Sequence, residues 1–271
     1  MLMLHIFTFF TDDSRLVYLK KTAEMFDLPI NYVVKSQNEY RGFTDKIFMI
    51  QEAISALPDN DIVCFMDAYD VLVSGTSDEI LQKFLSYNCA LLIGAELNSY
   101  PEGYDDAYPF TGSKTNYKHV NSGGYCGYKW AIAKMFSWKN ANEIVEICRL
   151  GGDQHYFIQY YLAHFADFSH NNSGIANIRL DTEAVIFQNM FQTDLSEFKF
   201  INGRVVNTAL NTYPCILHFN GNSWKLDNGE DIMPVFIDKM NASKNIDLKG
   251  IDLKGYSRCT WPNGLVRRSL A

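Results

Sequence analysis

The sequence has no cluster of lysines and arginines among its 271 residues, and its formal net charge is −7. Binding to nucleic acid needs a concentrated basic stripe, so we expect no nucleic-acid partner. A local basic group could still receive a diphosphate. No apolar stretch is long enough to cross a bilayer, which predicts no contact with a membrane.

The six cysteines include no C-x-x-C pair, so their spacing indicates neither a zinc site nor a disulfide framework. We therefore expect free thiols. The apolar residues 1–10 have no basic lead and no small-residue cleavage site, and they indicate a buried first strand rather than a signal peptide. As written, the chain is expected to be cytoplasmic; removal of a signal would instead place it in the secretory lumen.

Short apolar runs alternate with helical patterns in the first half of the chain. This β-α-β-α-β-α-β order predicts an α/β fold with a mostly parallel sheet and right-handed crossovers. A loop is predicted over 96–125, and long irregular segments of compact domains usually serve as lids or binding loops. The strands are expected at 2–10, 30–35, 61–67 and 90–95, and the helices at 11–26, 44–57 and 77–87.

The second half continues the same domain, which we expect to span residues 1–241. A C-terminal extension, 242–271, carries the pentapeptide Ile-Asp-Leu-Lys-Gly twice, at 246–250 and 251–255. Two copies are too few for a solenoid and indicate a local duplication. Helices are expected at 129–137, 152–165 and 230–241, and strands at 177–180, 184–188, 198–206 and 215–219.

Two carboxylates follow the third predicted strand, at Asp67 and Asp70. Ligands of parallel sheets collect beyond the carboxyl ends of the strands, and two hard oxygen ligands suit Mg²⁺ or Mn²⁺. Such a metal would bridge the phosphates of a nucleotide. The pair alone is equally compatible with a turn cap beside a solvated acid.

A histidine, His218, ends the strand predicted at 215–219. Imidazole added to two carboxylates shifts the preference from Mg²⁺ toward Mn²⁺. The Gly/Asn-rich turn that follows could offer backbone N–H groups to a diphosphate, and Lys225 could add charge. Taken alone, His218 is also compatible with a hydrogen-bonded strand-end histidine.

Three further groups of polar residues suit a sugar. Asn121-Ser122-Gly123-Gly124 combines amide and hydroxyl groups with glycines that allow close approach, although it also fits a turn entering a strand. Glu96 and Tyr100 follow the fourth strand. Asp153-Gln154 opens a predicted helix, where Asp153 is either an N-cap or a functional acid.

Together these motifs resemble the glycosyltransferase domain of the multifunctional procollagen lysyl hydroxylases, in the same order from about residue 4 to 226. The motifs are Tyr40-Arg41-Gly42 with Lys46, Met66-Asp67-Ala68-Tyr69-Asp70-Val71, Ala95-Glu96, Tyr100-Pro101-Glu102, Asn121-Ser122-Gly123-Gly124, Asp153-Gln154, Leu180-Asp181, Ile186-Phe187-Gln188-Asn189 and His218-x-Asn220-Gly221.

The resemblance implies a GT-A-type, Rossmann-like fold, with the metal site at the carboxyl ends of the strands, Mn²⁺ and a UDP-sugar donor. It also implies transfer of glucose to galactosyl-hydroxylysine of a collagen-like chain, with galactosyl transfer to hydroxylysine as a related activity. By motif, the implied metal ligands are Asp67, Asp70 and His218. The implied nucleotide contacts are Phe9, Thr11 and Tyr69, with Tyr69 stacked on uracil. The implied diphosphate contacts are Lys46, Asn220, Gly221 and Lys225. The implied sugar and acceptor residues are Glu96, Tyr100, Asn121, Asp153 and Gln154.

The sequence departs from the family pattern at three places. Gly151-Gly152 replaces an acidic run, tyrosines at 40 and 100 replace tryptophans, and one extra residue separates Gly221 from Lys225. No iron/2-oxoglutarate hydroxylase region follows. The alternatives are a UDP-galactose-using or other hexosyltransferase, and a silent module that binds a UDP-sugar or a collagen-like partner. Whether transfer retains or inverts the configuration stays open, with Asp153 as the candidate base for inversion.

Overall fold

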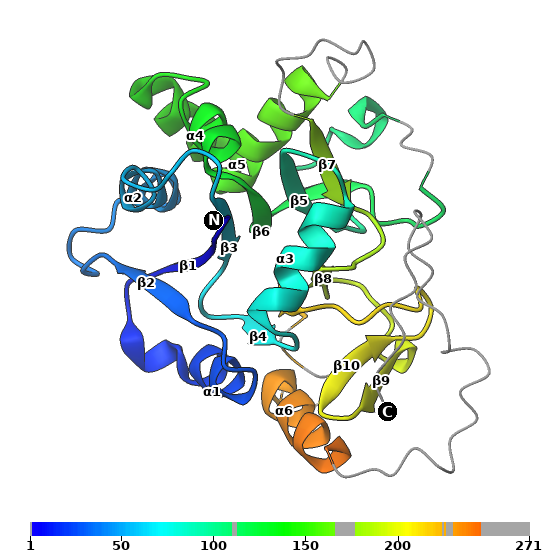
Figure 1. Cartoon of the computed structure of the whole chain (residues 1–271). Helices are drawn as coiled ribbons and strands as arrows, with labels where there is room; N and C mark the ends of the chain where they lie inside the picture. Colours follow the sequence, from blue (N-terminus) through cyan, green and yellow to red (C-terminus); the bar gives the residue numbers. More distant parts are fainter. Residues whose placement is uncertain (1, 110–112, 166–176, 224, 226–229, 245–271) are drawn as a thin grey trace.

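The structure is a computed structural model that describes residues 2–109, 113–165, 177–223, 225 and 230–244. The duplicated pentapeptide lies outside these residues, as does most of the expected extension 242–271. A six-stranded sheet in the order β2-β1-β3-β6-β5-β7 forms the centre (Figure 1). Its strands are β1 (Leu4–Phe10), β2 (Ile30–Val34), β3 (Ile62–Met66), β5 (Leu91–Glu96), β6 (His119–Tyr128) and β7 (Ile178–Asp181).

Parallel pairing dominates this sheet, which confirms the predicted fold class. Strand β1 is parallel to β2 and β3, and β5 is parallel to β7. Strand β6 is antiparallel to both of its neighbours, β3 and β5, and joins the two parallel halves. The predicted loop over 96–125 is therefore wrong at its end, because residues 119–128 form a buried central strand.

Strand β6 lacks a clear strand pattern in the sequence because it contains several glycines. A Cβ at Gly124 would lie 2.5 Å from the ring of Phe187, and a Cβ at Gly127 would lie 2.8 Å from the carbonyl oxygen of Ala90. Glycine weakens strand signals in a sequence, yet it is required where another element approaches the backbone closely. The neighbours that demand these glycines are distant in the sequence, so the local pattern could not reveal them.

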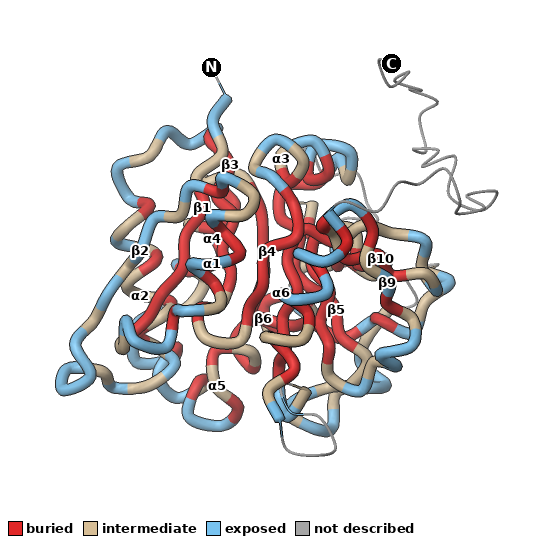
Figure 2. The backbone as a smooth tube through the Cα atoms, turned by 90° about the horizontal axis from the view of Figure 1, so that it is seen from below, coloured by how far each residue is buried: buried red, intermediate tan, exposed pale blue. Residues whose placement is uncertain are grey.

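Helices cover both faces of the sheet, as alternation along the strands requires. On one face, Phe7 and Phe65 pack with helices α2 (Thr44–Ala53), α4 (Lys129–Phe136) and α5 (Ala141–His164). On the other face, Ile6 and Cys64 pack with α1 (Val17–Met25) and α3 (Ser77–Ser86). Figure 2 shows the buried strands enclosed by more exposed helices and connections.

Two small sheets flank the central one. The first has the order β4 (Val71–Val73), β11 (Ile216–His218), β8 (Phe187–Asn189), and β4 is a strand that the sequence analysis did not predict. The second is a hairpin of β9 (Phe198–Ile201) and β10 (Arg204–Asn207), where one strand was expected over 198–206. Its turn is Asn202-Gly203, both with positive φ, which is the usual sequence of a tight hairpin turn.

The remaining helices differ modestly from expectation. Helix α6 (Ile232–Ser243) packs on the hairpin, and among the described residues short 3₁₀ segments lie at Asp13–Arg15, Asp105–Ala107 and Leu195–Glu197. Helix α5 begins eleven residues before the predicted position, 152, behind a capping box of Asn140 and Glu143. It is broken at Gly151 and Gly152, so the predicted helix at 152–165 corresponds to its second segment.

The expectation of free thiols holds in the part of the chain that the structure describes. Its five cysteines are free and buried: Cys64, Cys89, Cys126, Cys148 and Cys215. Burial raises the pKa of Cys89 and that of Cys148 to about 12, so both stay protonated thiols. Within the same residues, we find no helix with the length and apolar character needed to span a membrane.

A buried carboxylate, Asp181, fixes the turn between β7 and β8. Its oxygens accept the backbone N–H groups of Val185, Ile186 and Phe187, each at 2.8 Å. The hydroxyl of Tyr87 also donates to it. Burial raises the pKa of Asp181, although these donors oppose the shift.

Replacing this carboxylate should make the protein less stable. We expect Asp181→Ala to lower the free energy of unfolding by at least about 3 kcal/mol, because three buried N–H groups lose their acceptor. Glu183→Ala, an exposed change two residues away, should stay within about 0.5 kcal/mol. Urea unfolding followed by fluorescence measures both. Equal effects of the two variants would contradict this account of Asp181.

Candidate active site

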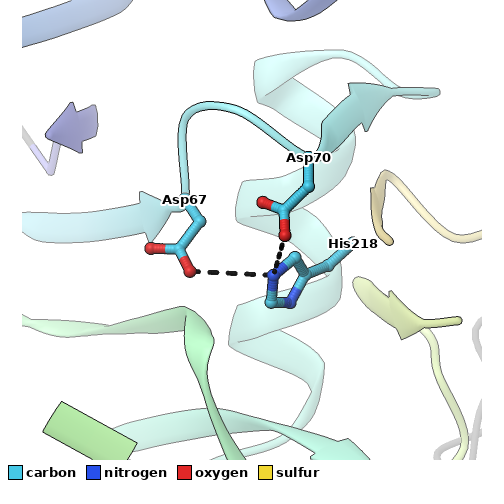
Figure 3. A group of neighbouring side chains, drawn as sticks. All are labelled: Asp67, Asp70 and His218. Atoms are coloured by element: carbon cyan, nitrogen blue, oxygen red, sulfur yellow. Dashed lines mark ion pairs between the residues drawn. The ribbon is translucent and has the colours of Figure 1, made fainter. Parts of the chain in front are cut away.

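Two carboxylates and an imidazole converge from segments about 150 residues apart. Asp67 follows β3, Asp70 precedes β4, and His218 ends β11, the strand that pairs with β4. The Nε2 atom of His218 lies 3.6 Å from Oδ2 of Asp67 and 3.4 Å from Oδ2 of Asp70 (Figure 3). One ligand atom from each residue lies within 4.8 Å of the others.

Backbone hydrogen bonds fix the main-chain positions of Asp67 and Asp70. The N–H of Asp67 donates to the carbonyl of Gly123 in β6 at 2.8 Å, and the carbonyl of Asp70 accepts the N–H of Phe219 at 2.7 Å. The two acids are thus held by β6 on one side and by the segment after β11 on the other. Pairing of β4 with β11 brings Asp70 beside His218.

The hydrogen bonds of His218 set its tautomer. Its Nδ1 faces two amide oxygens, Oδ1 of Asn121 at 3.0 Å and Oδ1 of Asn189 at 2.9 Å. Asn121 is oriented because its Oδ1 also accepts the N–H of Gly123, and Asn189 because its Nδ2 donates to the carbonyl of Ala95. Since both partners are acceptors, Nδ1 carries the proton. In the neutral imidazole, Nε2 then presents its lone pair to the carboxylates, as a metal ligand requires.

Gly123 makes room for this imidazole. A Cβ at position 123 would lie 2.1 Å from Cε1 of His218. We expected the paired glycines to admit a polar ligand such as a sugar. The structure gives them a different use, because Gly123 admits His218 and Gly124 admits Phe187.

The charges of the three groups are strongly linked. Burial raises the pKa of Asp67 and prevails over the lowering by Lys46 and His218. Burial also acts to raise the pKa of Asp70, but the nearby charge of His218 prevails and lowers it. For His218, burial acts to lower the pKa, and the carboxylates of Asp70 and Asp67 outweigh it and raise the pKa. Two hard oxygen ligands and one imidazole in this arrangement fit a divalent cation.

A buried lysine links this group to Asp153. Nζ of Lys46 lies 2.8 Å from Oδ1 of Asp67 and 2.6 Å from Oδ2 of Asp153, and its side chain is 11% exposed. Burial lowers the pKa of Lys46, but the charges of Asp153 and Asp67 outweigh that effect and raise it above the usual range. Lys46 is therefore cationic and balances part of the negative charge.

Glu96 holds the predicted sugar-side residues together. Its Oε1 accepts from Nδ2 of Asn121 at 3.0 Å and from Nε2 of Gln154 at 2.7 Å, and its Oε2 accepts from Nδ2 of Asn220 at 2.7 Å. These donors come from β6, from α5 and from the segment after β11. Glu96 is 3% exposed, and burial raises its pKa despite the three donors.

The predicted nucleotide residues lie at the end of β1. The hydroxyl of Tyr69 accepts the N–H groups of Thr11 at 2.7 Å and of Asp12 at 2.9 Å. The guanidinium of Arg15 lies 3.9 Å from the centroid of the Tyr69 ring. This ring is therefore anchored at its hydroxyl and covered by Arg15 on one face, while Phe9 is buried in the core.

Three predicted residues sit differently from the rest. Nζ of Lys225 pairs with Asp231 at 2.9 Å, so its charge is already compensated. Tyr100 is 63% exposed and reaches the network through its carbonyl, which accepts Nε2 of Gln154 at 2.9 Å. Gly221 has a φ of 63° and lies against the ring of Phe191.

The sequence analysis assigned no role to Asn189 or Arg15. Asn189 ends a short apolar run, just as His218 does. Its position at a strand end could have indicated a contact with His218, but only with the knowledge that β8 pairs with β11. Arg15 belongs to a 3₁₀ segment and carries no periodic signal that would connect it with Tyr69.

Comparison with known proteins identifies the family of this chain. A family model described as the PLOD GT domain matches residues 9–230. The chain belongs to this family of glycosyltransferase domains. Among its relatives is the human multifunctional procollagen lysine hydroxylase and glycosyltransferase LH3, 29% identical over 222 residues. Another is the uncharacterized protein R699 of Acanthamoeba polyphaga mimivirus, 28% identical over 190 residues.

These relatives are much longer proteins. The alignment with human LH3 covers 74% of this chain but 27% of LH3, and the alignment with R699 covers 69% of this chain and 37% of that protein. The matched part of the chain thus spans well under half the length of these two curated relatives. The family resemblance inferred from the motifs is confirmed.

A solved structure supports the fold. The galactosyltransferase LgtC, in complex with donor and acceptor sugar analogs, superposes with a TM-score of 0.51 over 93% of this chain and 99% of its own. At 13% sequence identity this likeness concerns the fold alone. Together with the sheet topology it identifies the fold as GT-A-type, as predicted.

Adding one methyl group beside the imidazole should disturb metal binding. We expect Gly123→Ala to weaken Mn²⁺ binding at least about tenfold, because the new Cβ displaces the ring of His218. The control is Gly127→Ala, a crowded glycine of the same strand whose Cβ faces Ala90 instead. Calorimetric titration of both variants, with circular dichroism to check folding, makes the comparison. Equal affinities would show that Gly123 does not support the site.

Metal binding should also depend on pH. A proton on Nε2 of His218 competes with a cation, and the raised pKa of this histidine lets the proton bind at higher pH than in a free imidazole. Affinity for Mn²⁺ should therefore be full above that pKa and fall as the pH decreases through it. Titrations between about pH 8 and pH 6 test this. An affinity that stays constant over this range would exclude His218 as a ligand.

Proposed function

We propose that this chain is a Mn²⁺-dependent hexosyltransferase that transfers glucose from UDP-glucose to galactosyl-hydroxylysine of a collagen-like chain. One observation carries the proposal: Asp67, Asp70 and His218 converge, with the histidine tautomer fixed for ligation, in a chain of the PLOD GT domain family. The names of its relatives, which include both procollagen lysine hydroxylase and glycosyltransferase, support the collagen-type acceptor.

The donor would lie between Tyr69 and the metal ligands. The ring of Tyr69 is partly exposed, packs beside Phe10 and Ala68, and would offer uracil a stacking surface next to the guanidinium of Arg15. A bound Mn²⁺ would supply positive charge to the diphosphate as UDP departs. Lys46 adds a second cation beside Asp67, and its raised pKa keeps it charged.

The transfer breaks the bond between the anomeric carbon and the β-phosphate oxygen, and UDP leaves with the electron pair. The acceptor hydroxyl forms the new bond and gives up its proton. For an inverting reaction the base would be Asp153, but this carboxylate is buried and paired with Lys46 at 2.6 Å. We therefore favour retention, in which the departing phosphate takes the proton on the same face.

The acceptor would be positioned by the network around Glu96. The amide nitrogen of Gln154 is held by this carboxylate and by the carbonyl of Tyr100, so its amide oxygen has a fixed direction, while Asn121 supports His218 from within. Fixed groups of this kind reject substrates that leave them unpaired. Tyr100, largely exposed at the same edge, offers an aromatic surface for a sugar ring.

A module that binds a UDP-sugar without transferring it is the second candidate. One observation favours it: the acidic run of the family is replaced by Gly151-Gly152, and the remaining acid, Asp153, is occupied by Lys46. A transferase using UDP-galactose differs from the main proposal only in the donor.

Release of UDP distinguishes these possibilities. With Mn²⁺ and a galactosyl-hydroxylysine peptide, we expect the protein to release UDP from UDP-glucose faster than from UDP-galactose, and from GDP- or ADP-sugars least. Asp67→Asn and His218→Ala should each lower this rate at least about a hundredfold, since each removes a ligand of the metal. Asp78→Asn, an exposed change in α3, should not alter it.

Each contrary outcome has its own meaning. UDP binding without release from any donor would favour the silent module. Undiminished rates in both ligand variants would exclude the metal site, and faster release from a GDP- or ADP-sugar would exclude UDP-sugars as donors.

A further inference from the structure

Phe43 is a large aromatic residue that lies exposed beside the candidate active site. It immediately precedes α2, three residues before Lys46, and 58% of its surface is exposed. Because residues three apart in a helical turn point in similar directions, Phe43 and Lys46 lie on one side of the start of α2. Lys46 binds Asp67 and Asp153, so Phe43 is placed next to the sugar side of the site.

The ring of Phe43 rests against the break in helix α5. A Cβ at Gly152 would lie 3.3 Å from Cδ2 of Phe43, so the ring packs on the glycine backbone. On the far side of the break, a Cβ at Gly151 would lie 2.8 Å from Pro101. The ring of Phe43 and that of Pro101 therefore contact the two glycines that precede Asp153.

This backbone excludes an acidic residue at position 152. Gly152 has φ 70° and ψ −169°, a combination that is essentially restricted to glycine. Because Gly152 carries no side chain, the ring of Phe43 covers the backbone directly before Asp153. The surface at this glycine is therefore aromatic.

An aromatic surface next to polar groups is suited to one class of ligand. A pyranose ring has an apolar face of C–H groups and a rim of hydroxyls, so it can lie on an aromatic ring while its hydroxyls reach polar partners. Beside Phe43 the polar partner is Gln154, which is half-buried and oriented by Glu96. The nucleotide is expected at Tyr69, near the end of β1, which leaves this surface for the acceptor.

We propose that Phe43 determines acceptor specificity by binding the apolar face of the acceptor's sugar ring, on the platform that it forms with Gly152. This inference rests on the proposed function and adds the residue that selects a glycosylated acceptor over a bare hydroxylysine.

Steady-state kinetics with a galactosyl-hydroxylysine peptide and with the same peptide lacking galactose test this inference. Phe43→Ala should raise the KM for the glycosylated peptide about five- to tenfold, with a smaller effect on kcat, because a stacking contact is lost. Phe43→Trp should restore the KM, and the KM for the bare peptide should not change. Val17→Ala, an equally exposed apolar change in α1, is the control.

Binding of UDP-glucose, measured by calorimetry without acceptor, separates this inference from the proposed function. If the wild-type protein binds the donor and transfers the sugar, but Phe43→Ala leaves the KM of the glycosylated peptide unchanged, the role of Phe43 is wrong and the proposed function stands. The role is also wrong if Phe43→Ala weakens donor binding as much as acceptor binding. If the wild-type protein transfers to no sugar-bearing acceptor, both fail.

Discussion

The carboxylate of Glu96 joins three parts of the chain that are otherwise separate: the central strand β6, the second segment of α5 and the segment after β11. Burying a charge is unfavourable unless hydrogen bonds replace the lost water, and three amide donors do so here. The same amides continue outward. Asn121 reaches Nδ1 of His218, and Asn220 accepts the N–H groups of Met190 and Phe191. The proposed metal ligands and the proposed sugar side therefore share one hydrogen-bonded support.

Electrostatics connects the two sides a second time. Lys46 contacts one acid from each, Asp67 and Asp153, and its ammonium is buried between them. A change of charge at Asp67 must therefore alter the environment of Asp153. In the proposed reaction, this contact would link the donor side to the acceptor side.

Much of this arrangement could be predicted from the sequence. Strands that end in Asp67 and His218 are strongly apolar, and the rule that ligands collect at strand ends places their side chains together. What could not be predicted depends on distant neighbours. Strand β6 was missed because its glycines respond to His218 and Phe187, which lie far away in the chain. The contact between Lys46 and Asp153 requires the break at Gly152, whose backbone angles leave no signature other than glycine itself. The dipeptide Asn202-Gly203, in contrast, is a local hairpin signal that the sequence does contain, and it argues for two strands over 198–206.

Glu96 pairs with His119 in the adjacent strand, and this pairing holds the two ends of residues 97–118 close together. Both ends of residues 97–118 are thereby fixed in the central sheet, and the free energy needed to close a loop rises only slowly with its length. Natural variation can lengthen, shorten or replace the middle of this segment while the sheet that supports Asp67 and Glu96 stays in register. Residues 97–118 could therefore be exchanged for another segment, which would change the proposed acceptor preference and leave the proposed donor side unchanged.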